Sequence, residues 1–140
     1  MNRTLAIMLG VVGLLVALIV VLVASRPSIP ERQERGQAAI TAACEAINNA
    51  TIDECTYHLP GSLLNATIAV SLHTESDADE VTNQVLTDAL KAVLASAEAS
   101  NSNTATIYVT VTDSAGTKHG PEDLGFSSNL HLSEIKKRFG

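Results

Sequence analysis

The longest apolar stretch of the chain lies near its N-terminus, from Thr4 to Ala24, and contains no charged residue and no proline. At about 1.5 Å per residue, a helix over this stretch is roughly 30 Å long, which matches the hydrocarbon core of a bilayer. We therefore predict a transmembrane anchor over 4–24 after a short tail, 1–3. A cleaved signal peptide ending at Val23-Ala24-Ser25 is the alternative, although its apolar region is normally only about 7–15 residues long.

Proline and serine follow the apolar stretch. Pro27 and Pro30 end the first helix, so residues 25–35 form a linker and the start of a second helix. That second helix is predicted over Glu31–Asn48, and the remaining domain over 36–140. Its narrow apolar face consists of Ile40, Ala43, Cys44 and Ile47, at helical spacing.

Three later segments alternate between apolar and polar residues with the period of a strand. They are predicted over Cys55–Leu59, Leu64–His73 and Ala105–Thr112. The pair Pro60-Gly61 predicts a tight turn, so the first two strands form an antiparallel hairpin. Asp113–Gly116 predicts a further turn after the third strand.

The strongest amphipathic helix is predicted over Asp77–Ala99, between the second and third strands. Asp77 and Glu80 have the spacing of a capping box. A last helical turn is predicted over Ser133–Phe139, with Ser133 as its cap. The wide apolar stripe of the long helix is suited to covering a sheet; it consists of Val81, Val85, Leu86, Ala89, Leu90, Val93, Leu94 and Ala97.

The order of elements is helix, strand, strand, helix, strand. A strand–helix–strand crossover is normally right-handed, which makes the second and third strands parallel neighbours. The predicted fold class is therefore α+β: one N-terminal transmembrane helix followed by a small two-layer α/β sandwich with helices on one sheet face.

Charge separates the domain from nucleic-acid-binding proteins. Residues 36–140 contain thirteen Asp and Glu against five Lys and Arg, and the chain has no Trp. Phosphate backbones select for Lys and Arg, and bases stack on aromatic side chains. We therefore predict no nucleic-acid partner.

Two observations conflict over the side of the membrane on which the domain lies. Cys44 and Cys55 are an even pair in a small acidic domain, which favours a disulfide and an oxidising compartment. Basic residues favour the cytoplasmic side, and more of them follow the anchor than precede it: Arg3 before, and Arg26, Arg32 and Arg35 after. We predict a single-pass signal anchor with an extracytoplasmic domain.

Searches for catalytic motifs find no nucleophile elbow, phosphate loop, zinc-protease motif or dinucleotide fingerprint. The acids Asp77, Asp79 and Glu80 are explained by a helix start. His58 and His73 lie on the polar side of the predicted hairpin, where they could share a metal with a further ligand. Surface histidines are the commoner reading, so no metal or cofactor is predicted. Two buried thiols, or a zinc site of Cys44, Cys55 and His58, are alternatives to the disulfide.

The polar side of the predicted sheet is rich in hydroxyl groups. An ordinary solvated face is one reading, and a docking surface for a protein partner is the other, carried by Thr67, Thr106, Tyr108 and Thr110. Two triplets here and nearby, Asn49-Ala50-Thr51 and Asn65-Ala66-Thr67, match the glycosylation sequon, a pattern that is frequent by chance.

Small residues line one side of the predicted anchor. Ala6, Gly10, Gly13 and Ala17 are spaced by four, three and four, so two helix backbones can approach closely there. This stripe predicts packing against a second copy or another membrane protein.

These patterns favour a membrane-tethered, non-enzymatic interaction or structural domain in an envelope or secretion assembly, or an exclusion factor. The alternative is a membrane-anchored hydrolase or metalloenzyme that uses His58 and His73.

Overall fold

The computed structural model describes residues 10–19, 28–60 and 65–140. Residues 10–19, part of the predicted anchor, are helical, and the rest of that anchor lies outside the described residues. Within the described part of the chain, no helix is both long enough and apolar enough to cross a membrane. The described helices thus give the transmembrane segment no support, and it stays a prediction from the sequence.

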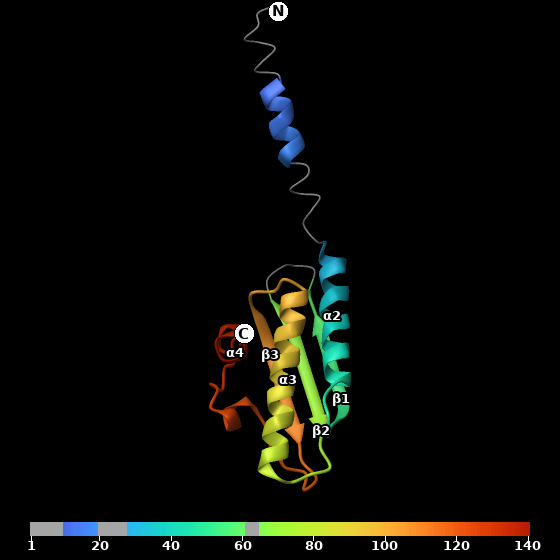
Figure 1. The fold of residues 1–140 in the computed structure, drawn as a ribbon, viewed down its shortest axis with the longest axis vertical. Helices are drawn as coiled ribbons and strands as arrows, with labels where there is room; N and C mark the ends of the chain where they lie inside the picture. The colour runs from blue at the N-terminus through green and yellow to red at the C-terminus, as the bar shows by residue number, and fades with distance from the viewer. Residues whose placement is uncertain (1–9, 20–27, 61–64) are drawn as a thin grey trace, which may run out of the picture.

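The domain is α+β, as predicted, with helices packed on a four-stranded sheet (Figure 1). The strands lie in the order β1-β2-β3-β4. In chain order the elements are α2 (Ile29–Glu45), β1 (Thr51–His58), β2 (Ala66–His73), α3 (Asp79–Ala99), β3 (Ala105–Thr112), β4 (Lys118–His119), the 3₁₀-helix η1 (Pro121–Leu124) and α4 (Leu132–Phe139).

Strand pairing confirms the predicted topology. β1 and β2 are antiparallel, and β2 and β3, which α3 connects, are parallel and in register from Ala66 opposite Ala105 to His73 opposite Thr112. The turn expected at Pro60-Gly61 falls largely on residues 61–64, which lie outside the described residues. β4 was not predicted, because two residues carry no readable alternation.

α2 and α3 cover one face of the sheet, and the core lies between these layers (Figure 1). The predicted stripe of α3 is buried except for Val81, which is half-buried. The strands contribute alternate side chains, among them Tyr57, Ile68, Val70, Leu72, Val109 and Val111. α2 adds Ile40 and Cys44, and the C-terminal segment adds Phe126, Leu130, Leu132 and Ile135.

Two glutamine side chains of α2 cover the outer edge of β1. Gln37 accepts the Tyr57 N–H at 2.9 Å and donates to the Cys55 carbonyl at 3.2 Å. Gln33 accepts the Leu59 N–H at 2.6 Å and donates to the Tyr57 carbonyl at 2.6 Å. Four helix residues advance about 6 Å and two strand residues about 6.6 Å, so the two amides follow the strand as a neighbouring strand would.

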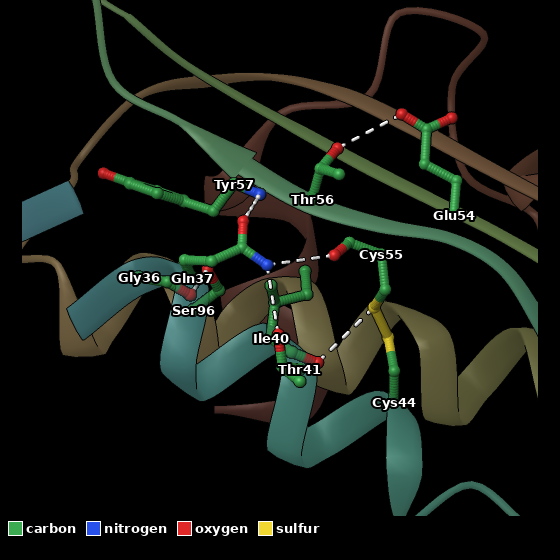
Figure 2. Close-up of a disulfide and its surroundings, with 10 residues drawn as sticks. All are labelled: Gly36, Gln37, Ile40, Thr41, Cys44, Glu54, Cys55, Thr56, Tyr57 and Ser96. Atoms are coloured by element: carbon green, nitrogen blue, oxygen red, sulfur yellow. Dashed lines mark hydrogen bonds between the residues drawn. A yellow bond between two sulfur atoms is a disulfide. The ribbon is translucent and has the colours of Figure 1, made fainter. Parts of the chain in front are cut away.

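Gly36 lies between these glutamines and lets the Tyr57 ring lie directly against the α2 backbone (Figure 2). A Cβ atom on Gly36 would come within 2.5 Å of ring carbons of Tyr57. The Ser96 hydroxyl of α3 donates to the Gly36 carbonyl at 2.7 Å. The missing side chain of Gly36 therefore sets the distance between α2 and its neighbours.

The helix starts differ from the predictions. α2 begins at Ile29 and is capped by Ser28, whose hydroxyl accepts the Glu31 N–H at 3.4 Å, so the expected linker over 25–35 already contains two helical turns. The predicted Asp77 capping box is wrong: α3 is preceded by Ala78, without a side-chain cap, and the preceding turn is held by its hydroxyl-bearing residues.

The predicted cap of the last helix is also wrong. α4 begins at Leu132 after His131, so Ser133 lies inside the helix. Glu134 reaches back to this start, where its carboxylate accepts the His131 N–H at 3.3 Å and the Ser127 hydroxyl at 2.7 Å.

We expect Gly36→Ala to destabilise the full-length protein. In an unhindered helix this change stabilises by about 0.5–1 kcal/mol. At Gly36 the added methyl group overpacks Tyr57, a cost of about 1–3 kcal/mol, so the free energy of unfolding should fall by about 1–2 kcal/mol. Chemical denaturation followed by circular dichroism measures this change.

The double variant Gly36→Ala/Tyr57→Leu is the control, since removing the ring makes room for the methyl group. The two changes should be non-additive, with the alanine costing less beside Leu than beside Tyr57. A Gly36→Ala protein as stable as the parent would contradict the close contact.

Candidate functional site

Hydroxyl-bearing side chains gather on the sheet face opposite α2 and α3. Because β2 and β3 are parallel and in register, Thr67 lies beside Thr106, and Ser71 beside Thr110, with Tyr108 between them next to Ala69. The structure thus places the four predicted surface residues on adjacent strands of one face. We call Thr67, Ser71, Thr106, Tyr108 and Thr110 the hydroxyl face.

Tyr108 is the most prominent residue of the hydroxyl face. It is 60% exposed, the largest exposed fraction among the big apolar side chains of β1–β3. Thr106 is also exposed, whereas Thr67 and Thr110 are half-buried between their neighbours. An aromatic ring that presents both an apolar surface and a hydroxyl is a common anchor of protein interfaces.

The two histidines that could have shared a metal lie apart. His58 pairs with Thr67 near one end of the hairpin, while His73 pairs with Thr51 at the other end. The partner of His58 on β2 is Thr67, six residues before His73. At about 3.3 Å per residue, this separates the two histidines by roughly 20 Å along the strand. The Nδ1 atom of His73 instead contacts the Asp53 carboxylate.

Metal-binding side chains do not converge elsewhere in the part of the chain that the structure describes, where no group of three or more His, Cys, Asp or Glu could hold an ion. The reading of Cys44, Cys55 and His58 as zinc ligands has no geometric basis, because His58 points to the sheet face opposite the cysteines.

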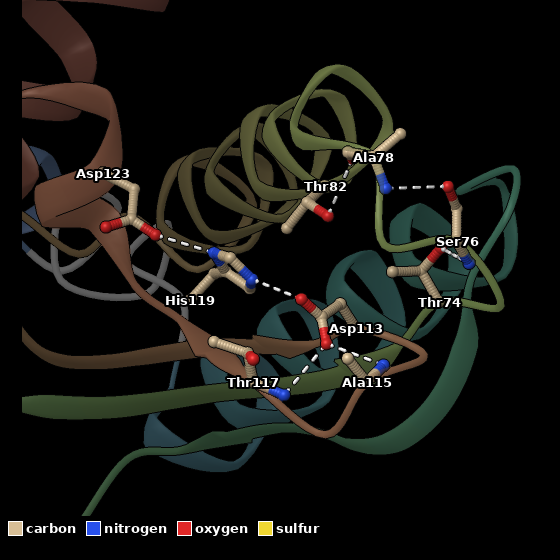
Figure 3. Close-up of polar contacts among 9 residues, drawn as sticks. All are labelled: Thr74, Ser76, Ala78, Thr82, Asp113, Ala115, Thr117, His119 and Asp123. Carbon is tan, nitrogen blue, oxygen red and sulfur yellow. Dashed lines mark hydrogen bonds and ion pairs between the residues drawn. The ribbon is translucent and has the colours of Figure 1, made fainter.

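A polar cluster that sequence reasoning missed lies where β3 turns into β4. His119 of β4 stands between two carboxylates, with Nε2 at 2.9 Å from Asp113 Oδ2 and Nδ1 at 2.9 Å from Asp123 Oδ2 (Figure 3). The other Asp113 oxygen accepts the backbone N–H groups of Ala115 at 3.0 Å and Thr117 at 2.9 Å. Asp113 is buried, while Asp123 is exposed.

Pairing between His119 and Asp113 shifts the pKa of both residues. The hydrogen bond to Asp113 raises the pKa of His119, against the opposing effect of burial, and the bond to Asp123 raises it further. The hydrogen bond from His119 and the backbone N–H of Thr117 lower the pKa of Asp113. The charged forms of both residues therefore stabilise each other.

This geometry suits a structural clamp better than a catalytic group. A general base needs a free ring nitrogen, and each nitrogen of His119 faces a carboxylate. The cluster instead links the turn after β3, the short strand β4 and η1 through three residues that lie within eleven positions of the chain. We name Asp113, His119 and Asp123 the carboxylate–histidine clamp.

The sequence contains one signal for the clamp, the turn that begins at Asp113. Asp113 opens a predicted turn, and an Asp at that position commonly bonds the backbone two residues on. The left-handed backbone of Gly116, with φ at 83°, completes the turn. The roles of His119 and Asp123 depend on the positions of β4 and η1. Both elements are too short for a periodic pattern to predict them.

Cys44 of α2 and Cys55 of β1 lie at disulfide distance, with their Cα atoms 6.7 Å apart (Figure 2). Cys44 is buried and Cys55 half-buried. Cys44 lies about two helical turns beyond Gln37, on the same side of α2. The predicted pairing of these residues is thus compatible with the packing of α2 on β1.

Of the small-residue stripe, Gly10, Gly13 and Ala17 fall in the described helical segment 10–19, and Ala6 lies outside the described residues. A Cβ atom on either glycine would meet nothing within 4 Å. The role of the stripe in helix packing stays a prediction.

Comparisons with protein-family models, with curated proteins and with solved structures found no match for this chain. The fold and the site define a small α+β domain in which the described sheet face opposite α2 and α3 is lined by hydroxyl groups.

We expect the contribution of the clamp to stability to depend on pH. Because folding raises the pKa of His119, this residue stabilises the fold fully at a pH below its unfolded pKa of about 6.5. That stabilisation is lost as the pH rises through the pKa of His119 in the folded protein. A lowered Asp113 pKa stabilises above about 3.8, and this effect is lost as pH falls through the folded value. The melting temperature of His119→Gln should therefore fall furthest below that of the parent near pH 5.

Thermal melts of the full-length parent and variant between pH 4 and pH 9 test this. His58→Gln, which changes an exposed histidine on the open face, is the matched control and should leave the melting temperature nearly unchanged. A His119→Gln deficit that is constant across this range would show that the clamp acts only through packing.

We predict that Cys44 and Cys55 are bonded in the protein isolated from its source without reductant. Alkylation without reduction, followed by intact-mass analysis, should find no modified thiol. Because the closed loop is short, the bond should add about 2–3 kcal/mol to the free energy of unfolding. Two alkylated thiols would contradict the bond and weaken the case for an oxidising compartment.

Proposed function

We propose that this chain is a non-enzymatic interaction domain that binds a protein partner through its hydroxyl face. The exposed ring of Tyr108 is the observation that carries the proposal. Aromatic side chains with a polar tip dominate the binding energy of many interfaces, and the surrounding threonines can exchange hydrogen bonds with water or a partner. The acidic composition argues against nucleic acid as the partner.

The domain is tethered to a membrane by the apolar segment 4–24 in this proposal. The domain's first described helix, α2, begins at Ile29, only a few residues after this segment in the sequence. The stripe of Ala6, Gly10, Gly13 and Ala17 would pack against a second copy or another membrane helix. A partner in the same membrane assembly is therefore favoured.

An extracytoplasmic location is supported by the cysteine pair. Disulfides persist in oxidising compartments and are rare in the cytosol, and Cys44 and Cys55 lie at the required distance. An acidic, tethered domain on the extracytoplasmic side would suit a component of an envelope or secretion assembly, or an exclusion factor.

The hydrolase alternative loses its basis in the separation of His58 from His73. That alternative used both imidazoles, and His58 of β1 and His73 of β2 lie at opposite ends of the hairpin. His119, the remaining histidine with close acidic partners, has both nitrogens engaged. The arrangement of the described residues thus favours binding over hydrolysis.

Photo-crosslinking in native membranes tests the proposal. A photoreactive phenylalanine at position 108 of the full-length chain should crosslink to a defined partner. Position 95, an exposed alanine of α3 on the helical side, is the control and should give no such product. Tyr108→Lys should lower recovery of that partner more than tenfold, since loss of an aromatic anchor typically costs about 2 kcal/mol or more.

Crosslinks that form from position 95 and not from position 108 would place the interaction on the helical layer instead. Unchanged recovery with Tyr108→Lys would likewise contradict the hydroxyl face as the binding surface.

A further inference from the structure

The two edges of the sheet differ in how their backbone groups are covered. The edge of β1 is closed by the side-chain amides of Gln33 and Gln37. On the other side, β4 pairs with β3 only at Val111 and Thr112. Among the described residues, no strand pairs with β3 on this side from Ala105 to Thr110.

The backbone direction shows which groups this open edge presents. The Thr112 carbonyl faces the β2 side, where it accepts the Thr74 N–H at 2.9 Å. The Asp113 N–H faces the β4 side, where it donates to the Thr117 carbonyl at 2.9 Å. Since backbone groups alternate along a strand, Ile107 and Val109 direct their N–H and C=O groups to the open edge.

The strand β3 itself carries no charge, proline or bulge of the kind that usually protects an edge strand. Its sequence, Ala-Thr-Ile-Tyr-Val-Thr-Val-Thr, contains no charge and no proline, and its pairing with β2 shows no bulge. Edge strands of natural proteins are normally protected by lysine, by proline, by a bulge or by a covering helix or loop, because an unprotected edge pairs with strands of other chains. An uncharged edge rich in β-branched residues is suited to accept another strand.

Space for that strand lies directly beside β3. Two hollows of about 350 Å³ and 490 Å³ follow its edge, and both are lined by Leu130. The first also contacts Ile107 and Val109, and the second Ala105 and Thr106. Together they run past the stretch of β3 that has no neighbouring strand.

The helical layer extends beyond the sheet at this place. α4 and η1 contact α3, and the Lys91 ammonium lies 5.7 Å from the Phe139 ring centre. β4 occupies only two residues of the strand position next to β3. The rest of that position is bounded on the helical side by the segment that carries Leu130.

We propose that β3 accepts one extended peptide segment of a partner as an added strand, paired with Ala105–Thr110. This proposal rests on the interaction function proposed above and specifies how the partner binds. Ile107 and Val109 supply the backbone hydrogen bonds, as in other cases of strand addition to a sheet edge. The hydroxyl face would then continue onto the added strand.

The surroundings define the chemistry of that segment. Its inward side chains meet Ile107, Val109 and Leu130, so alternate residues should be apolar and β-branched or aromatic. Its outward side chains continue the row of Thr106, Tyr108 and Thr110, so the residues between should be polar and uncharged. Six residues at about 3.3 Å each match the open length of β3.

A lone strand fits this position better than a second copy of the chain. Two β3 strands paired about a two-fold axis would carry both helical layers on the same face of the joined sheet. The segment that carries Leu130 lines the hollows beside β3, so in each copy it would compete for space with the helical layer of the other. A segment without its own helical layer avoids this overlap.

The test uses the ¹⁵N-labelled full-length chain in detergent and a defined probe. The probe is a synthetic peptide with the sequence of β3, flanked by lysines for solubility, because it is a lone strand with the required alternation. Binding should slow hydrogen exchange of the Ile107 and Val109 amides at least tenfold and shift the Leu130 signals. The same peptide methylated on alternate backbone nitrogens should give no protection.

Ile107→Pro removes one outward N–H without breaking a bond to β2 and should weaken peptide binding more than tenfold. Ile107→Val keeps that N–H and should bind like the parent. Should the proline variant fail to fold by circular dichroism, Ile107→Lys, which places a charge at the edge, serves the same purpose.

Unprotected Ile107 and Val109 amides at saturating peptide would overturn the proposal, as would equal protection by the methylated peptide. A dimer of the full chain that Ile107→Pro dissociates would also overturn it, in favour of a second copy. Crosslinking from position 108 without peptide protection would leave the hydroxyl face as the binding surface and remove only the added strand.

Discussion

The close approach of α2 to β1 is the constraint on which the rest of the domain depends. It is possible because Gly36 has no side chain, so the Tyr57 ring packs against the helix backbone. Gln33 and Gln37 then reach the strand and satisfy backbone groups that would otherwise be open. The Tyr57 hydroxyl lies 2.9 Å from that of Ser102, which connects this contact to the loop after α3.

This contact makes the sheet asymmetric. A helix that closes one outer edge and lies on one face leaves the opposite face and the opposite edge to other groups. On that face the side chains carry hydroxyls and one exposed ring, Tyr108, and on that edge β4 covers two residues only. The polar face and the open edge adjoin along β3, which is why both proposals of function concern the same strand.

The carboxylate–histidine clamp determines where the C-terminal segment leaves the sheet. Asp113 holds the turn after β3, and His119 ties β4 to η1 through Asp123. The chain is thereby directed away from β3 before it returns to α3 as α4.

Local patterns in the sequence determined the elements and their main topology. Period-two and period-3.6 spacing predicted β2, β3 and α3, and the handedness of crossovers predicted the parallel pairing. Tertiary structure alone decided the register, which separates His58 from His73, and the convergence of Asp113, His119 and Asp123. The physical reason is that periodicity records which side of an element is buried, whereas register, edge cover and ion pairs depend on contacts between segments distant along the chain.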